Sequence, residues 1–314
     1  MCAGNHWGRL RGCLDSFEDM CGIVGLFSKS PGVSDSLGRH LGDMLLQLSD
    51  RGPDSAGVAF YRDPAPAGGS KVSLFSADPR QDWAAVGEAI GSEPEVHGSH
   101  AVFVFDAEAA EAVRWLRERY PELRVMSAGE KIEIYKEAGR PERFVEEFDL
   151  ASLQGSHALG HTRMATESKV TTDGSHPFST GLDLCLVHNG SLSNHNRLRE
   201  RLRAEGIEFQ TENDSEVAAG YLTHRLREGA SLEAALEGCL DDLDGFYTFA
   251  VGTKDGFAVL RDPIACKPAV MAQTDEWVAM ASEYRAIAVL PGAEEAETWE
   301  PEPGRVYSWE RAPV

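Results

Sequence analysis

Short apolar segments that recur along the second half of the chain constrain its fold more than any other feature. They read ALGHTR, LCLVHNG, FYTFAVGT, GFAVLRD, PAVMAQ and WVAMAS. Segments of this length and composition, bounded by turn-forming residues, predict buried strands. Helical patterns with leucine at helical intervals lie between them, at about 193–204, 215–227 and 231–240. This succession predicts stacked sheets that are covered by helices.

The same pattern begins earlier, at CGIVGLFS, which predicts a buried strand starting at Cys21. A helix should follow, because the next apolar residues share one helical face. They are Leu37, Leu41, Met44, Leu45 and Leu48. RGPDSAG, at 51–57, ends this helix with glycine and proline, and VAFY resumes the strand pattern.

The segment of about 62–155 differs from what surrounds it. It opens with the linker-like RDPAPAGGS, and then HAVFVFD and KIEIYKE predict strands while EAAEAVRWLRERY and PERFVEEF predict helices. We therefore expect an inserted α/β subdomain inside a domain that spans 21–310. Residues 1–20 lack the continuous apolar region of a secretory signal, so we expect a leader or propeptide, or an upstream artefact of the assigned start.

Composition excludes two classes of partner. The formal net charge of -21 would repel phosphate backbones, so we expect no nucleic-acid partner. No apolar run approaches the roughly 20 residues that span a bilayer, so we expect no membrane association. The six cysteines form no CxxC pair, and most have apolar neighbours, which favours a reducing, cytoplasmic setting.

Cys21 has the sequence context of a nucleophile. It directly follows Met20, and removal of an initiator methionine would leave Cys21 with a free α-amine. The reference pKa of such an amine is about 7.7 to 8.0 and that of a thiol about 8.5. The amine could therefore take the thiol proton and later return it to a leaving group. The alternative is a structural cysteine at the edge of an apolar strand.

Asn189 and Gly190 follow an apolar strand, in LVHNGSLSN, ahead of a helix that we expect to open at Ser193. The Asn189 amide and the Gly190 backbone N–H could point at one position and form an oxyanion hole, where one donor is worth about 10² to 10³ in rate. The alternative is that Asn-Gly forms an ordinary hairpin turn.

Two charged residues could recognise the two ends of an amino acid. Arg163 ends a strand beside Thr162 and Thr166, and its guanidinium suits bidentate capture of a carboxylate. The alternative is a surface ion pair. Asp214, just before a predicted helix, could pair with an ammonium group, and its alternative role is the helix N-cap.

Three histidines could indicate a metal site or a catalytic triad. His161, His176 and His188 match no zinc spacing, however, and a histidine on a strand is more often structural. We expect no metal site.

Taken together and in order, the motifs resemble one family. Met-CGIVGLF, RGPDSAG, GHTRMAT, SHPF, HNGSLSNH, NDSEV, LDGFYTF, RDPIACKP and ASEYRAI resemble successive blocks of class II glutamine amidotransferases, which are N-terminal nucleophile hydrolases. The resemblance covers nearly all of 20–61 and 156–310. It implies an α+β fold, a four-layer α/β/β/α sandwich of antiparallel sheets.

The resemblance also implies catalytic roles. Cys21 would form the γ-glutamyl thioester, and Asn189 with Gly190 would hold its oxyanion. One departure from the family is Met164, which stands where many relatives carry an aromatic residue. The resemblance therefore does not specify the details of gating or pocket closure in this chain.

The substrate implied by the resemblance is L-glutamine. Arg163, assisted by Thr166, would bind its α-carboxylate, and Asp214 would bind its α-ammonium. Arg51 and His176 match family residues that shape the glutamine pocket.

A second departure is that the chain ends soon after these blocks, whereas many relatives carry a synthase domain on the same polypeptide. KIEIYKEAGRP, ACKPAVMA and EPEPGRVYSW resemble the stand-alone amidotransferase subunit of a split, glutamate-synthase-like enzyme, most closely that of N-methylglutamate synthase. Ammonia would then pass to partner subunits that carry FMN and iron-sulfur clusters, and this chain would need no cofactor.

Two other functions compete with this interpretation. Another N-terminal nucleophile hydrolase, such as a bile-salt or penicillin acylase, would favour an apolar acyl pocket, which the Arg163 and Asp214 pair argues against. An inactive or regulatory scaffold subunit would keep the fold without the activity. Only the leader favours it, because an attached leader would block the Cys21 amine.

Overall fold

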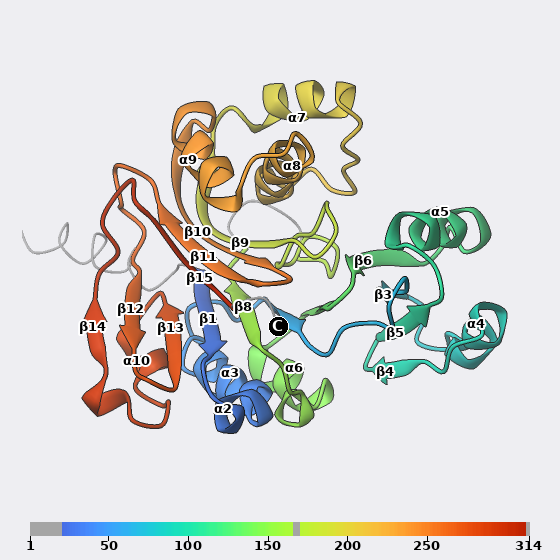
Figure 1. The fold of residues 1–314 in the computed structure, drawn as a ribbon, viewed down its shortest axis with the longest axis horizontal. Coiled ribbons are helices and arrows are strands. Elements are labelled where there is room, and N and C mark those ends of the chain that lie inside the picture. The colour runs from blue at the N-terminus through green and yellow to red at the C-terminus, as the bar shows by residue number, and fades with distance from the viewer. Residues whose placement is uncertain (1–20, 166–169, 312–314) are drawn as a thin grey trace, which may run out of the picture.

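The computed structural model describes residues 21–165 and 170–311. Two sheets stack face to face with helices on both outer faces, and a third sheet stands to one side (Figure 1). All pairs of neighbouring strands are antiparallel. The predicted α/β/β/α sandwich of antiparallel sheets is confirmed.

The larger sheet has seven strands in the order β14-β12-β13-β1-β8-β2-β7. They are β1 (Gly22–Ser28), β2 (Ser55–Tyr61), β7 (Ile132–Ala138), β8 (His157–Arg163), β12 (Val270–Gln273), β13 (Trp277–Ala281) and β14 (Glu297–Trp299). The apolar run of β1 is explained by its central position, because every residue of the strand is buried.

The facing sheet has four strands in the order β15-β11-β10-β9. They are β9 (Cys185–Leu192), β10 (Gly245–Thr253), β11 (Gly256–Arg261) and β15 (Val306–Glu310). β9 is an edge strand of this sheet, and the Phe178 backbone forms an isolated bridge to Leu186 on its outer side.

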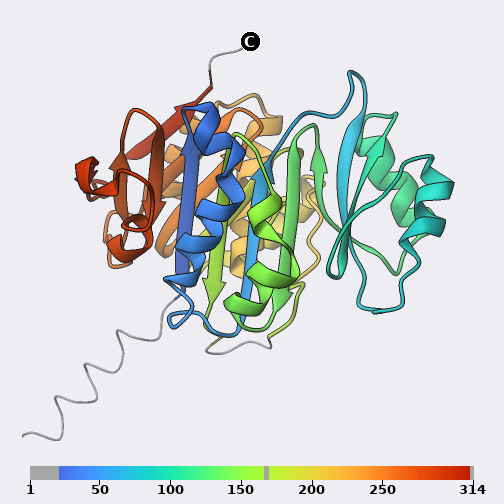
Figure 2. The ribbon, with the colours of Figure 1, turned by 90° about the horizontal axis from the view of Figure 1, so that it is seen from below.

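Helices cover the outer face of each sheet. Figure 2 shows the helices over the large sheet, with the early, blue ones lying across its central strands. They are α2 (Pro31–Asp35), α3 (Leu37–Leu46), α6 (Pro141–Glu147) and α10 (Tyr284–Ile287), with short 3-10 turns at Leu150–Ser152 and Ala293–Glu295. Over the other sheet lie α7 (His195–Ala204), α8 (Asp214–Arg227) and α9 (Leu232–Asp242). None of the helices in 21–165 or 170–311 is long and apolar enough to cross a bilayer.

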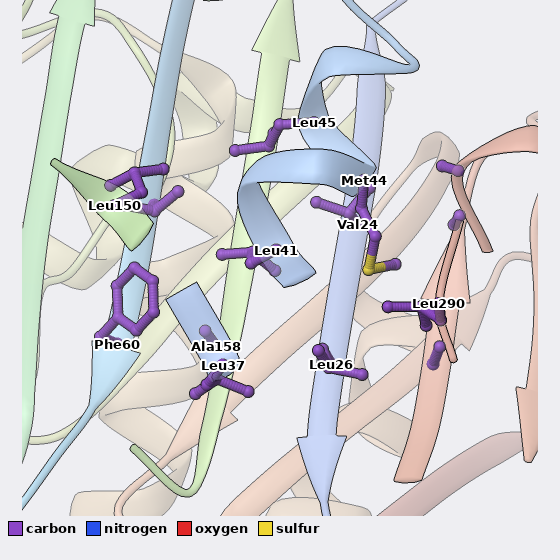
Figure 3. Packing of buried hydrophobic residues seen from close by; sticks show 14 of the residues in the cluster. Val24, Leu26, Leu37, Leu41, Met44, Leu45, Phe60, Leu150, Ala158 and Leu290 are labelled. Atoms are coloured by element: carbon purple, nitrogen blue, oxygen red, sulfur yellow. The ribbon is translucent and has the colours of Figure 1, made fainter. Parts of the chain in front are cut away.

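Three apolar cores separate the four layers. The side chains of β1 alternate between two of them, because successive residues of a strand point to opposite faces. Val24 and Leu26 pack with Leu41 of α3 beneath the helices (Figure 3), whereas Ile23 and Phe27 pack between the two sheets. The third core joins the four-stranded sheet to α7, α8 and α9.

The third sheet belongs to the segment predicted as an insertion, and it has its own apolar core. Its order is β4-β5-β3-β6. The strands are β3 (Ser70–Phe75), β4 (Glu95–His97), β5 (His100–Phe105) and β6 (Arg124–Gly129), and the helices are α4 (Trp83–Ile90) and α5 (Ala109–Arg119).

The 62–155 segment divides between two sheets. Its part up to Gly129 forms the third sheet, but β7 pairs along the whole of β2 in the large sheet, with Ile132 opposite Tyr61. Residues of α6 and of the turn after it also enter the core beneath α3. The part that forms a separate sheet is therefore shorter than the segment that we expected to be inserted.

Buried carboxylates tie this third sheet to the sandwich. Glu133 of β7 is fully buried and pairs with Arg62 at 2.8 Å and with Lys71 of β3 at 2.7 Å. On the other side, the Asp183 carboxylate accepts hydrogen bonds from three consecutive backbone N–H groups, those of 130–132, at 2.6 to 3.1 Å.

Candidate active site

Cys21 lies immediately before β1, at the end of the large sheet where β8 finishes and β2 begins. Its side chain is partly exposed, and its thiol donates to the Met164 carbonyl at 3.8 Å. Burial raises the pKa of the Cys21 thiol, while the Met164 contact and the charges of Arg163 and Lys267 act in the opposite direction. The thiol is therefore protonated at neutral pH and needs a base before it can attack.

Asn189 reaches Cys21 from the facing sheet. Its side-chain Nδ2 donates to the Cys21 carbonyl oxygen at 3.1 Å. Asn189 and Gly190 lie within β9, opposite Thr248 and Tyr247 of β10, so the alternative of a hairpin turn is wrong. The helix expected to open at Ser193 begins instead at His195, because β9 continues to Leu192.

Gly190 occupies a position that only glycine can fill. Its φ of +152° disfavours any residue with a Cβ, and a Cβ there would collide with the Phe246 carbonyl. The same Cβ would lie 2.7 Å from Nε2 of His188. The HNG sequence thus brings bare backbone and an amide side chain to the Cys21 end of the sandwich.

Arg163 is the last residue of β8 and is buried, so the alternative of a surface ion pair is wrong. The RGPDSAG segment braces it, because Asp54 N donates to the Arg163 carbonyl at 3.1 Å and the Asp54 carboxylate accepts from Ala165 N at 2.8 Å. Thr166, expected to assist Arg163, lies outside the described residues.

Arg51 is also buried, and its Nη1 pairs with Glu283 in the ASEYRAI segment. Glu283 pairs in turn with Arg285 at 2.6 Å, and Arg285 pairs with Asp50 at 2.8 Å. Nε and Nη2 of Arg51 have no hydrogen-bond partner among the residues that the structure describes. One side of the Arg51 guanidinium is therefore fixed and the other is available to a ligand.

The three histidines come together beside Arg163. The rings of His161 and His176 stack with centroids 4.0 Å apart, and His188 lies 6.5 Å from His176. Burial lowers the pKa of His161 to about 3 and that of His188 to about 4, and it lowers the pKa of His176 well below the usual value. All three rings are therefore neutral at pH 7. Within 21–165 and 170–311 no group of His, Cys, Asp or Glu has the arrangement of a metal site.

Asp214 is the first residue of α8, but it does not cap the helix. The N-cap is Asn213, whose side chain accepts from Ser215 N at 2.9 Å, so the capping alternative for Asp214 is wrong. The Asp214 carboxylate instead accepts from Leu192 N at the end of β9, at 2.8 Å. Ser215 continues the same connection, since its hydroxyl lies 2.8 Å from Nδ1 of His188.

Buried polar atoms without a hydrogen-bond partner among the described residues gather at this end of the sandwich. They are Nε and Nη2 of Arg51, Oγ of Ser55, Nδ1 of His161, both ring nitrogens of His176 and Nε2 of His188. Elsewhere in the described chain such atoms occur singly, on Ser30, His100, Arg199 and Arg261. Each unpartnered buried group costs about 1 to 3 kcal/mol, so a cluster of them is typical of a site that a polar ligand completes.

Lys267 is missing from the site residues that we predicted from the sequence. It lies in the family-like block RDPIACKP, and its charge acts on both Cys21 and His188. Its Nζ lies 5.4 Å from the centre of the Phe246 ring. The signal that could have revealed it is a cation shortly after a strand, within a block that resembles the family.

Two cavities, of about 570 and 600 Å³, lie away from Cys21. They are bounded by the third sheet with its α5, by the 179–184 loop and by α8. The chemistry-bearing residues and these two cavities are therefore in different places. We assign the site by the residues, because the cavities contain none of the predicted catalytic groups.

Comparison with known proteins identifies relatives of this chain. A family described as "Glutamine amidotransferase domain" matches residues 161–289. The chain is 56% identical over 297 residues to "Glutamine amidotransferase-like protein GlxB" of Rhizobium meliloti, covering 93% of this chain and 98% of that protein. It is 32% identical over 312 residues to a "Putative glutamine amidotransferase" of Methanothermobacter thermautotrophicus, covering 92% and 99%.

A solved structure has the same fold. Glutamine phosphoribosylpyrophosphate amidotransferase from B. subtilis superposes with a TM-score of 0.60 at 20% identity. The superposition covers 92% of this chain but 47% of that one, so this chain spans about half the length of that protein.

Proposed function

This chain belongs to the class II glutamine amidotransferases, and on that basis we propose that it hydrolyses L-glutamine to glutamate and ammonia through a thioester on Cys21. The observation that carries the proposal is the contact of Cys21 with Asn189 at the one end of the sandwich where unpartnered buried polar atoms of the described residues gather. This end offers a nucleophile, an oxyanion donor and groups that a polar substrate can satisfy.

In the proposed mechanism the free α-amine of Cys21 takes the thiol proton, and the thiolate attacks the γ-carboxamide carbon of glutamine. The oxyanion that forms is stabilised by the Asn189 amide and the Gly190 N–H. The intermediate collapses to the thioester as the ammonium group returns its proton to the departing ammonia. Water then hydrolyses the thioester and releases glutamate.

The raised pKa of the Cys21 thiol supports the need for this base, because little thiolate exists at neutral pH without one. The three neighbouring histidines are held neutral by burial. We therefore assign the thiol proton of Cys21 to the α-amine of the same residue and not to the histidines.

For the substrate, we propose that Arg163 with Thr166 binds the α-carboxylate and that Asp214 binds the α-ammonium, with Arg51 and His176 shaping the pocket. The burial of Arg163 supports this role, because a buried guanidinium favours a carboxylate partner. The same polar surroundings argue against an acylase, whose acyl group needs an apolar pocket.

We further propose that ammonia passes to a separate glutamate-synthase-like partner, most like the one served by the amidotransferase subunit of N-methylglutamate synthase. Support comes from the two long alignments, which cover 98% and 99% of the relatives and so leave no space in those proteins for a synthase domain. FMN and iron-sulfur clusters would be carried by the partner. A reducing cytoplasm would keep the Cys21 thiol free for catalysis.

The experiment compares protein that begins at Cys21 with protein that retains Met1. An amide nitrogen cannot act as the base because its lone pair is delocalised, so only the first form should release ammonia from glutamine. Intact mass identifies the N-terminus, and Cys21→Ser in the trimmed form is the control. Equal activity in both forms would overturn the mechanism.

The same assay separates the regulatory alternative. A folded protein that begins at Cys21 and leaves glutamine intact would support an inactive scaffold. Ammonia release that rises on addition of the partner subunits would support coupled transfer, and full activity of the isolated chain would count against it.

A further inference from the structure

Lys136 of β7 is a buried cation, and the hydrogen-bond acceptors of its side chain among the described residues lie in one loop. Its side chain is 4% exposed, and Nζ donates to the backbone carbonyls of Asp173, Ser175 and Pro177 at 3.2, 2.8 and 3.3 Å. Nζ also lies 4.7 Å from the centre of the Phe178 ring. One ammonium group therefore fixes three alternate carbonyls of the segment that contains His176.

Glu137, the next residue of β7, contacts the same loop from the opposite face of the strand. Its Oε1 accepts from the Thr172 hydroxyl, and its Oε2 accepts from the Ser99 hydroxyl at 2.6 Å. Consecutive strand residues point to opposite faces. On β7, Ile134 packs between the sheets like Lys136, and Tyr135 packs beneath the helices like Glu137.

The loop also needs space at its centre. Gly57 of β2 lies directly opposite Lys136, and a Cβ at Gly57 would collide with the His176 carbonyl. The His176 ring then stacks on His161, two residues before Arg163. The loop is thus pressed onto the strands that end at the candidate site.

We propose that Lys136 and Glu137 are positioning residues that together hold the 171–178 loop and so place His176 against the pocket in which glutamine binds. This inference rests on the proposed function, because it takes His176 to form part of the glutamine pocket. The inference adds strand β7 to the elements that shape the glutamine site. In the sequence, β7 comes directly after the last strand of the third sheet.

The charge of Lys136 gives the loop a dependence on pH. Burial lowers its pKa to about 8, opposed by the charges of Glu216 on α8 and Asp173 in the loop. His176 and His100 also face it, and both are held neutral by burial. As the pH rises through about 8, Lys136 loses its charge and its bonds to the three carbonyls weaken.

The experiment measures glutamine binding by calorimetry in a Cys21→Ala background, which can bind without hydrolysis. Lys136→Met should raise the Kd for glutamine by about tenfold, because three charged hydrogen bonds to the loop are lost. Lys131→Met is the matched control, since Lys131 lies just before β7 and donates to the Lys254 carbonyl, away from the loop. An unchanged Kd in Lys136→Met would overturn the inference.

Two further measurements separate positioning from a general loss of structure. In the Cys21→Ala protein that retains Lys136, the Kd for glutamine should rise between pH 7 and 8.5. It should rise relative to the Kd of Lys136→Met, because position 136 no longer titrates in that variant. The amine of glutamine titrates equally in both, so the ratio of the two Kd values isolates Lys136. A ratio that does not change with pH would count against the role.

If Lys136→Met does not fold, Glu137→Gln tests the same loop from its other face and should raise the Kd by about threefold. A wild-type Kd in that variant would overturn the inference. Hydrolysis is measured separately in the chain that begins at Cys21. A chain that binds glutamine in a Lys136-dependent way without hydrolysing it would refute the proposed mechanism and leave the positioning role in place.

Discussion

The two ends of β8 are equally buried, but the histidines at the two ends differ in how completely they are hydrogen bonded. At its start, His157 has both ring nitrogens partnered, Nδ1 with the Ser156 hydroxyl and Nε2 with the Thr253 carbonyl, each at 2.8 Å. Its ring also stacks on Tyr61. Toward its other end, His161 has one unpartnered nitrogen and His176 has two, as judged within the described residues.

This difference is not one of burial, because burial lowers the pKa of both His157 and His161 to about 3. It concerns what completes the hydrogen bonds. The end of β8 at His157 is here called the closed end. Its polar groups find hydrogen-bond partners within the chain, which contributes stability. The other end, near His161 and His176, is here called the open end. Its polar groups lack partners among the described residues, and in the proposed function the substrate completes their hydrogen bonds.

The largest effect should come from the open end. Asn189→Ala removes one proposed oxyanion donor and should lower kcat by about 10²- to 10³-fold, while the melting temperature stays close to that of the wild type. Steady-state kinetics and thermal unfolding measure the two quantities. A kcat near that of the wild type would refute the oxyanion role of Asn189.

A change at the closed end should have the reverse effect. His157→Ala removes two satisfied hydrogen bonds and a stacked ring, so we expect the free energy of unfolding to fall by about 3 kcal/mol. The KM for glutamine should not change. Denaturant unfolding and steady-state kinetics of this variant should be compared with those of His176→Ala. If both variants changed stability and KM by similar amounts, the two ends of β8 would not differ in role.

Asp214 sharpens the comparison within a single helix start. Asp214→Ala should raise the KM for glutamine by about tenfold, because binding of the α-ammonium is lost in the ground and transition states alike. The matched control is Asn213→Ala, which removes the N-cap and should cost about 1 kcal/mol of stability with KM unchanged. If Asp214→Ala lowered stability without changing KM, and Asn213→Ala raised KM instead, Asp214 would have a structural role.

The smallest effect concerns acid. The unfolded chain protonates its histidines near pH 6.5, whereas His157 and His161 stay neutral in the folded chain down to about pH 3. Stability is therefore present above pH 6.5 and is lost as the pH falls toward 3. Between pH 7.5 and 6.0 each such histidine should account for a loss of about 0.8 kcal/mol.

Replacement of His157 or His161 by a glutamine residue tests whether burial alone sets the pKa values of these two histidines. His157→Gln and His161→Gln should reduce the pH dependence of the unfolding free energy by equal amounts. A smaller reduction for His161 would mean that the open end is hydrated in solution.

The layers of the fold could be predicted because their signals are local. The β1 run and the leucine-spaced helices carry their own periodicity, and α7, α8 and α9 agree with prediction to within two residues at each end. Strand pairing is different, since KIEIYKE predicts a strand but does not identify β2 as its partner. Hydrophobic alternation specifies a face and not a neighbour.

The site shows the same limit. Asn189–Gly190 has the local signature of a turn, but pairing with β10 overrides it and keeps both residues in β9. Asn213 and Asp214 are equally good capping residues, so local chemistry could not choose between them. Lys136 has no signal in its own strand, because its three carbonyl partners come from a loop far along the chain.

The pairing of Tyr61 with Ile132 has a consequence for how the molecule can be shortened. These two residues face each other at the ends of β2 and β7, and everything between them leaves and re-enters the sandwich at this one point. Joining them by a two-residue turn would convert β2 and β7 into a simple hairpin and delete the third sheet with its separate core. The Asp183 carboxylate, which now accepts from the returning backbone, would then need donors from the new turn. Excision of the third sheet therefore requires repair at Asp183 and also at the buried Glu133, which would lose both Arg62 and Lys71.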